Sequence, residues 1–201
     1  MGESVAALRF YAKTAPIISF EPNPFFASRI ARRFRSDPNV EVRHIAISDV
    51  EGTLPLYIPV YRYTTFPELA TLNKTEAGNW LPSRIIHFNP AQQTILELEC
   101  RSCNLDSLGL DPEIVKIDTR CNASAVIEGG VGTIVKSRPI ILLGYAILTP
   151  RCRNLLEDAN YLIFSVHKNR LRYARPEDRC DFLIHTSFFP RLSETGLIFQ
   201  S

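Results

Sequence analysis

The sequence predicts an α/β fold built on a mostly parallel sheet. Short apolar runs typical of buried strands alternate with segments of helical period, and the first four segments follow the order helix, strand, helix, strand. The 201 residues are 45% hydrophobic, which is enough to form the core of one globular domain. We therefore expect a single domain over residues 1–201.

The N-terminal quarter shows this alternation most clearly. Residues 4–13 place apolar side chains at helical spacing, with Ser4 as the expected cap. The apolar run 16–20 is a predicted strand, and residues 25–34 form an amphipathic segment with arginines on one side. Residues 40–48, VEVRHIAIS, are predicted to be one further strand.

The middle of the chain is less regular. Residues 49–52 are a predicted turn and 53–63 a strand, whereas residues 62–93 mix polar, aromatic and proline residues. We expect this last segment to leave the sheet and to cover a site. Its tryptophan, Trp80, either lines an acceptor pocket or packs in the core, and packing is the favoured interpretation.

The remaining elements continue the alternation to the C-terminus. The predicted strands are 95–103, 113–118, 138–146, 161–169 and 180–189. A helical turn is expected over 104–110, and helices over 122–130 and 151–159. Glycines Gly129 and Gly130 are expected to stop the first of these helices.

Charge and cysteine content exclude several classes of function. Lys and Arg number 23 against 21 Asp and Glu, and no basic stripe favours nucleic acid. Neither a membrane span nor a signal peptide is predicted, so we expect a soluble, cytoplasmic protein. The 5 cysteines lack the spacing of a disulfide framework. Cys100 and Cys103 would point to opposite faces of a strand, so no metal site is predicted.

Acidic residues stand at the ends of predicted strands. Glu21, Asp49 and Asp118 each follow an apolar run, and ligands of open parallel sheets bind at the carboxyl ends of the strands. Glu21 lies about 20 residues beyond Gly2, the spacing expected between a glycine-rich turn and a ribose-binding acid. The alternative is that Glu21 belongs to the turn that opens the next helix, together with Asn23 and Pro24.

Several segments together resemble the FkbM-type methyltransferases, which use S-adenosylmethionine. They are FEPNP (20–24), NVEVRHIAISDVEGTLPLY (39–57), LECRSCNLDSLGL (98–110), IVKID (114–118) and RPIILL (138–143). The resemblance implies a class I methyltransferase fold, a Rossmann-like, mostly parallel seven-stranded sheet whose last strand is antiparallel. Family members carry a strand and a glycine-bearing loop before the equivalent of GES, so we expect this sheet to lack its first strand.

The resemblance also implies roles for individual residues. Glu21 would hold the ribose hydroxyls, Ser48 and Asp49 would lie near the adenine, and Gly2 would be the last glycine under the methionine part. The predicted cofactor-binding set, completed by Ser4 and Asn23, is therefore Gly2, Ser4, Glu21, Asn23, Ser48 and Asp49. Asp118 is the predicted catalytic residue, which orients or deprotonates the acceptor; the alternative is that it caps the helix starting near Asn122.

The chain departs from the family pattern after KID. Where the family reads KIDVEGAE this chain reads KIDTRCNA, so Arg120 and Ala123 replace glutamates, and Gly144 replaces another acid. The predicted function is O-methylation of a small molecule or glycan; the alternative is a non-catalytic fragment or pseudoenzyme with the same fold. A nicotinamide-dependent oxidoreductase is a third, weaker interpretation. The sequence leaves the acceptor and the oligomeric state open.

Overall fold

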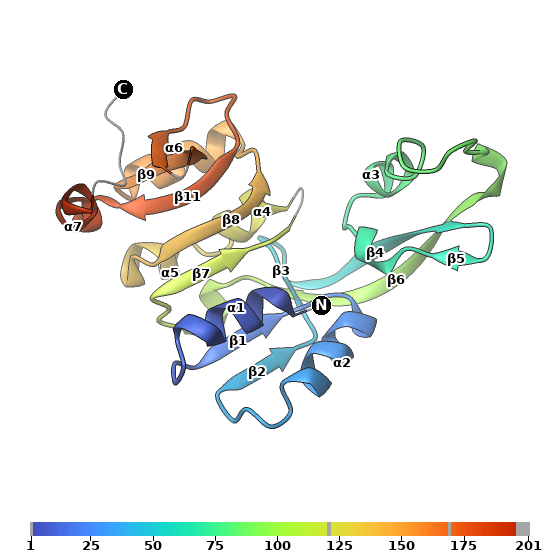
Figure 1. Cartoon of the computed structure of the whole chain (residues 1–201), viewed down its shortest axis with the longest axis horizontal. Helices are drawn as coiled ribbons and strands as arrows, with labels where there is room; N and C mark the ends of the chain where they lie inside the picture. The colour runs from blue at the N-terminus through green and yellow to red at the C-terminus, as the bar shows by residue number, and fades with distance from the viewer. Residues whose placement is uncertain (1, 120–121, 169, 196–201) are drawn as a thin grey trace. The chain divides into compact units, whose positions relative to one another are not determined.

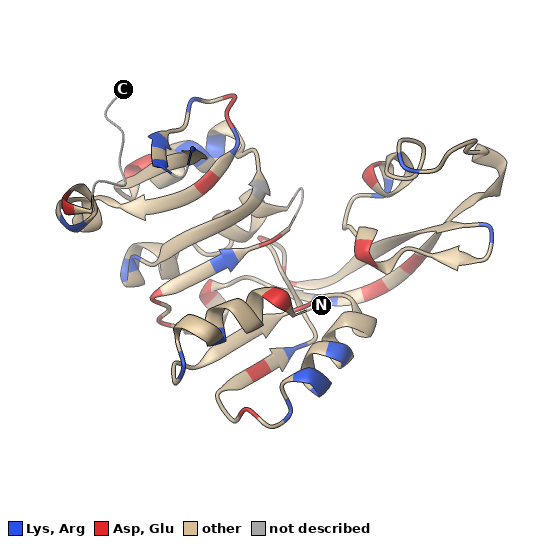
Figure 2. Cartoon of the chain, viewed as in Figure 1, with Lys and Arg blue, Asp and Glu red and all other residues tan. Residues whose placement is uncertain are grey.

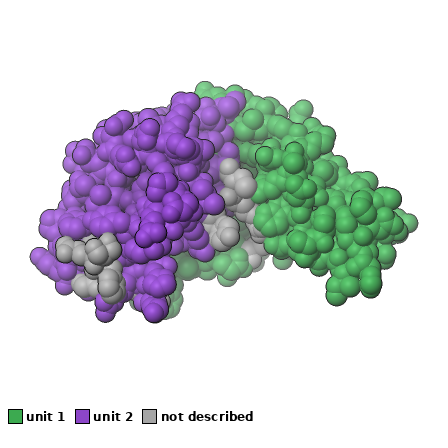
Figure 3. Space-filling model, turned by 90° about the horizontal axis from the view of Figure 1, so that it is seen from above, with its two compact units in different colours: residues 1–47, 51–103 green, residues 48–50, 104–201 purple. Residues whose placement is uncertain are grey.

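The computed structural model describes residues 2–119, 122–168 and 170–195, which form an α/β structure with mixed sheets. The chain divides into two compact units, coloured separately in Figure 3. The first unit contains residues 1–47 and 51–103, and the second contains 48–50 and 104–201. The single domain expected from composition stays a prediction.

The first unit opens with the predicted helix–strand–helix–strand order. Its elements are α1 (Glu3–Tyr11), β1 (Ile17–Phe20), α2 (Pro24–Arg33) and β2 (Val40–Arg43). β1 and β2 are parallel, with Ile17 opposite Val40. The α2 helix begins as the sequence predicts, because the Asn23 side chain accepts a hydrogen bond from the Phe25 N–H and Pro24 occupies the first helical position.

The strand predicted over 40–48 is wrong as a single element. It is divided into β2 and β3 (Ala46–Ile47), and β3 pairs in parallel with β6 (Gln93–Cys103) in a different sheet. The break lies at His44, where the Ile45 N–H donates to the Arg43 carbonyl, 3.0 Å away, in a tight turn. Half-buried residues lie on both sides of this turn, so hydrophobic alternation alone does not reveal the change of sheet.

A long antiparallel pair dominates the rest of the first unit. β4 (Gly52–Tyr61) and β6 run side by side over the whole of β4, with β5 (Thr64–Thr65) on the outer edge of β4 (Figure 1). The expected excursion is the connection between β4 and β6. It contains η1 (Pro67–Leu69), α3 (Lys74–Asn79) and η2 (Pro90–Gln92).

The second unit is built on a mixed sheet with strand order β10-β9-β11-β8-β7. Its strands are β7 (Ile114–Ile117), β8 (Ile140–Ala146), β9 (Tyr161–His167), β10 (Arg170–Tyr173) and β11 (Cys180–His185). β7 and β8 are parallel, whereas β11 lies between β8 and β9 and is antiparallel to both. The last strand in the described part of the chain is therefore antiparallel, as predicted.

Helices connect these strands, and some of them were not predicted. They are η3 (Asp106–Leu108), α4 (Ala123–Glu128), α5 (Val131–Ser137), α6 (Pro150–Asp158), η4 (Thr186–Phe188) and α7 (Phe189–Glu194). The sequence prediction stopped at Gly129 and Gly130, but α5 starts directly after them. The N–H groups of its second and third residues, Gly132 and Thr133, donate to the Asp106 carboxylate at 2.9 and 2.6 Å.

The strand predicted over 180–189 is too long. β11 ends at His185, whose Nδ1 accepts a hydrogen bond from the Ser187 N–H and caps η4. Pro190 then occupies the first turn of α7. The aromatic residues after His185 are therefore helical, although their composition is typical of a strand.

Asn23 links two segments of the first unit, and its replacement tests this link. The side chain is 1% exposed; its Oδ1 caps α2, and its Nδ2 donates to the Pro67 carbonyl, 3.2 Å away. We expect Asn23→Ala to lower the free energy of unfolding by about 1–3 kcal/mol, since it removes both the cap of α2 and the hydrogen bond that joins this helix to Pro67. Asn73→Ala, which removes an exposed cap on α3, is the control and should cost less. Equal shifts of the urea midpoint would contradict the link.

Candidate functional site

Glu21 lies directly after β1, at the carboxyl end of the parallel pair. Its N–H donates to the Arg43 carbonyl at 3.1 Å, which continues the β1–β2 pairing by one residue. Its Oε1 accepts a hydrogen bond from the Asn23 N–H at 2.9 Å. Among the described residues, no donor reaches Oε2. The carboxylate is therefore fixed through one oxygen and still has acceptor capacity for a ligand hydroxyl.

Burial controls the protonation of Glu21. It raises the pKa of the carboxyl above its usual value, and the Asn23 N–H and the charge of His44 oppose this rise. His44 is held nearby, since its Nε2 lies 3.0 Å from the Pro22 carbonyl oxygen. The ionised carboxylate is thus partly desolvated, and a hydroxyl donor would favour its charged form.

The structure contains the turn role of Glu21, and its role in holding a ribose stays a prediction. The contact with the Asn23 N–H is a turn contact, while Asn23 itself caps α2. The turn role uses one oxygen only, so it is compatible with ligand binding. Asn23 is buried, and its side chain is already committed to Phe25 and Pro67. It therefore supports the turn.

Gly2 is required by the backbone at the start of α1. It is the N-cap residue, with a left-handed φ of 76°, and a Cβ there would lie 3.1 Å from the Phe34 ring. Gly2 therefore packs closely against Ile30 of α2 and the neighbouring Phe34. The prediction that Ser4 caps this helix is wrong: Ser4 lies inside α1, because the left-handed conformation of Gly2 starts the helix two residues earlier and no side chain caps it.

Ser48 and Asp49 form a local pair in the second unit. The buried Ser48 hydroxyl donates to Asp49 Oδ1 at 3.0 Å. Their backbone packs directly on Gly129, where an added Cβ would overlap the Ser48 carbonyl and lie 3.0 Å from the Asp49 Cα. The first turn after α4 therefore supports both residues, and only glycine fits there.

Asp118 follows β7 and is held by two neighbours in the same unit. Its Oδ2 accepts from Lys116 Nζ at 2.6 Å in an ion pair. An added Cβ at Gly144, on the adjacent β8, would overlap Asp118 Oδ1. The glycine at position 144 therefore makes room for the Asp118 carboxylate. Arg120 lies outside the described residues.

Among the described residues, no hydrogen bond supports the alternative that Asp118 caps α4. The N-cap residue of α4 is Asn122, and no side-chain hydrogen bond caps that helix. The Asp118 carboxylate contacts Lys116 and Gly144 instead. It therefore remains available at the end of β7, although Lys116 neutralises part of its charge.

The predicted site residues belong to both units. Gly2, Ser4, Glu21 and Asn23 lie in the first, whereas Ser48, Asp49 and Asp118 lie in the second. Within each unit the structure joins Glu21 to Asn23 and Ser48 to Asp49 by hydrogen bonds. That all of them surround one ligand stays a prediction.

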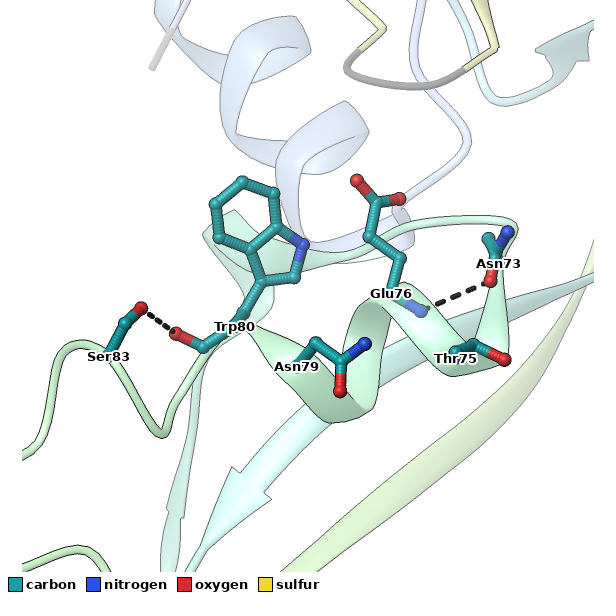
Figure 4. A pocket seen from close by; sticks show the side chains of 6 residues that line it. All are labelled: Asn73, Thr75, Glu76, Asn79, Trp80 and Ser83. Carbon is teal, nitrogen blue, oxygen red and sulfur yellow. Dashed lines mark hydrogen bonds between the residues drawn. The ribbon is translucent and has the colours of Figure 1, made fainter.

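The structure has a pocket beside α3, which we call the α3 pocket; of its lining residues, sequence analysis named only Trp80, as one of two alternatives. It has a volume of about 460 Å³ and is shown in Figure 4. The Trp80 ring and the Glu76 carboxylate project from the same side of the helix, one turn apart. Polar side chains complete the lining: Asn73, Thr75, Asn79 and Ser83. The spacing of residues 73, 76 and 80 is the signal that could have indicated it.

Trp80 combines packing with a position in the pocket. It packs against the core cluster of Tyr61, Leu69 and Leu81, as the favoured interpretation predicts. The Arg84 guanidinium carbon also lies 5.0 Å from the ring centroid. The indole is thus held in place, while it contributes to the wall of the pocket.

The described residues contain no group of three or more His, Cys, Asp or Glu side chains placed to hold a metal ion. Cys100 is buried in β6, and burial raises the pKa of its thiol.

None of the helices in the described ranges combines the length and apolar composition needed to cross a bilayer.

The comparisons with known proteins give a structural likeness. The sequence matches no family model and no curated protein. The fold is similar to the crystal structure of methyltransferase FkbM from Methylobacillus flagellatus KT, with a TM-score of 0.53 and 14% sequence identity. The likeness covers 90% of this chain and 40% of that chain, so this chain spans less than half of the length of that protein. At this identity the comparison shows a methyltransferase-like fold.

Proposed function

We propose that the chain has a class I methyltransferase fold, binds S-adenosylmethionine and transfers its methyl group to an oxygen of a small molecule or glycan. The observation that carries the proposal is the Glu21 carboxylate, which is anchored by the Asn23 N–H at the end of β1 and keeps acceptor capacity on Oε2. The antiparallel β11 between β8 and β9 and the FkbM-like fold support the same class.

The residues present suit an adenosyl ligand. Two carboxylate oxygens match the two vicinal hydroxyls of a ribose, which donate to them. Gly2 brings the first turn of α1 against α2 with no side chain in the way. The bound cofactor would supply an already activated methyl group. The protein must then hold the acceptor in line with that group and accept or release one proton.

Asp118 is the proposed group for orienting the acceptor hydroxyl. Lys116 holds one of its oxygens at 2.6 Å, and Gly144 leaves room for the other. A carboxylate paired with an ammonium group is still a good hydrogen-bond acceptor. Asp118 would therefore position the hydroxyl, and the proton would pass to solvent.

The α3 pocket favours a hydroxyl-rich acceptor. An aromatic ring offers an apolar face to a sugar ring, while the Glu76 carboxylate and the amides of Asn73 and Asn79 offer donors and acceptors for hydroxyls. These side chains fit the glycan better than an apolar natural product.

A non-catalytic fragment or pseudoenzyme is the second candidate. It is favoured by the Lys116–Asp118 ion pair and by Gly144, because together they leave no uncompensated acid among the described residues at the ends of β7 and β8. Such a protein would keep the fold and bind the cofactor weakly or not at all.

Calorimetric titration of the full chain with S-adenosylmethionine and with S-adenosylhomocysteine separates these candidates. We expect saturable binding of both. Absence of heat at millimolar ligand would remove the enzyme hypothesis and support the second candidate. Thermal protection by NAD but not by either adenosyl ligand would instead support the oxidoreductase.

A further inference from the structure

A second hollow of the first unit lies between α2 and the sheet of β4, β5 and β6; we call it the α2 groove. It has a volume of about 600 Å³, within the range of small-molecule sites. Phe25, Arg29 and Arg32 line it from α2, and Ile58, Leu96 and Pro67 line it from the other side. These residues lie outside the α3 pocket and are not among the predicted cofactor-binding residues.

One part of the α2 groove is apolar and open to solvent. Ile58 and Leu96 are cross-strand partners in the β4–β6 pair and form part of its floor. Leu96 is 38% exposed and Phe25 on the facing helix is 57% exposed. Such large exposed apolar side chains, gathered in one concave place, are typical of a surface that binds an apolar group.

The other part is cationic and has no counter-ion among the described residues. Arg29 and Arg32 are three residues apart, so their side chains lie on one side of α2. Figure 2 shows blue bands of basic residues on this helix. Neither makes an ion pair or hydrogen bond with another described residue. Arg33 on the same helix, in contrast, reaches Glu3 at 3.5 Å. Two guanidinium groups side by side suit a carboxylate, which accepts hydrogen bonds with both oxygens.

The two walls are tied together near one end of the groove. Asn23 Nδ2 donates to the carbonyl of Pro67, which joins the start of α2 to η1. Pro24 and Pro67, both at the groove, restrict the backbone on each side of this bond. The groove is therefore preformed, which lowers the entropic cost of binding.

We infer that the α2 groove binds a small amphiphilic carboxylate. Its apolar chain would lie against Phe25 and Leu96, above the buried Ile58, and its carboxylate would be held by Arg29 and Arg32. This inference does not depend on methyl transfer, because the groove shares no lining residue with the proposed cofactor set. Its failure would leave the proposed function unchanged.

Monomeric decanoate, below its micellar concentration, is the probe. Calorimetry on the full chain without cofactor should show saturable binding of decanoate, and clearly weaker binding of decanol and of decylamine. The double variant Arg29→Gln/Arg32→Gln should weaken decanoate binding about tenfold or more, the effect of losing charge-assisted hydrogen bonds. Phe25→Ser should also weaken it, since Phe25 is mostly exposed and its loss leaves the core intact.

The matched control is Arg33→Gln/Arg35→Gln, which removes the same charge from residues outside the groove. It should leave the Kd for decanoate within about twofold, well below a tenfold effect. Equal weakening by the two double variants, or equal affinity for decanoate and decylamine, would overturn the inference. Binding to anionic phospholipid vesicles without binding to monomeric decanoate would also overturn it, in favour of a membrane surface. Circular dichroism checks that each variant is folded.

Discussion

Gly129→Ala should destabilise the second unit by about 1–3 kcal/mol or more, the cost of overpacking a site that cannot relax. The new Cβ would overlap the Ser48 carbonyl and lie 3.0 Å from the Asp49 Cα, and both obstacles are backbone. A flexible side chain could rotate away, but here a whole segment must move. Because the Gly129 carbonyl also accepts from the Asp106 N–H, movement of α4 would disturb η3 as well.

Gly78→Ala is the matched control in a helix. The only atom described within 4 Å of a Cβ there is Ile95 Cδ1, at 4.0 Å, so the methyl group fits. Alanine should then stabilise α3 by up to about 1 kcal/mol through helix propensity. Urea midpoints of the two variants should move in opposite directions. A midpoint for Gly129→Ala equal to that of the unsubstituted chain would show that residues 48–50 do not pack on α4.

The same substitution connects stability to function. Ser48 and Asp49, the residues proposed to lie near the adenine, rest on Gly129. If the proposal holds, Gly129→Ala should weaken binding of S-adenosylhomocysteine under conditions where the variant is still folded, and Gly78→Ala should not.

Local signals were sufficient where a segment carries its own start or stop. Asn23 followed by Pro24 predicted the beginning of α2, and the structure has both residues in the expected cap and first-turn roles. The apolar runs that became β1, β7, β8 and β9 are also local features, because each is bounded by polar or turn residues. These elements needed no knowledge of distant residues.

Long-range contacts decided the elements that the sequence missed. The start of α5 depends on the Asp106 carboxylate, which comes from a segment far away in the chain. The division of residues 40–48 depends on which partner each half finds, β1 for β2 and β6 for β3. Periodicity within a window contains neither piece of information.

In the candidate site, too, local sequence signals predicted some features, whereas others depend on long-range contacts. The position of Glu21 after β1 followed from local pattern, but its contact with the Asn23 N–H and its burial required the folded chain. The room that Gly144 leaves for Asp118 depends on the register of β7 and β8, which a sequence does not display. The arginines of α2 were predicted only as one side of an amphipathic segment. No local pattern indicates that the β4–β6 pair lies opposite two of them.

Replacement of Glu21 should separate stability from ligand binding. Glu21→Ala removes the acceptor for the Asn23 N–H and for the ribose, whereas Glu21→Gln keeps a carbonyl oxygen near that N–H and removes the charge. We expect either variant to weaken S-adenosylhomocysteine binding by about 1.5–3 kcal/mol, roughly 10- to 100-fold, the value of hydrogen bonds to a charged group. Calorimetry measures this change, and unchanged affinity would leave Glu21 with the turn role alone.

The two variants should differ in stability because only Glu21→Gln keeps an acceptor for the Asn23 N–H. Burial raises the pKa of Glu21 in the folded protein, so the unfolded chain ionises first as the pH rises above 4.5. Stability contributed by the protonated carboxyl is complete below that pH and is lost as the pH rises through the folded pKa. Glu21→Gln should therefore be more stable than the unsubstituted chain at pH 7 and nearly equal to it near pH 4. Glu21→Ala removes the same desolvated charge but also loses the turn contact, so it should be less stable than Glu21→Gln at both pH values.

If Glu21→Gln stabilises the chain but abolishes binding of the adenosyl ligand, the desolvated charge of Glu21 explains both results. The folded chain tolerates a desolvated charge that its own contacts do not fully compensate, since Oε2 accepts from no described residue. A ligand hydroxyl on that oxygen would supply the compensation and lower the pKa of Glu21 again, so binding should tighten as the pH rises through the folded pKa. If Glu21 served only the turn, ligand binding would not depend on its ionisation, because the Asn23 N–H can also donate to a neutral carbonyl oxygen.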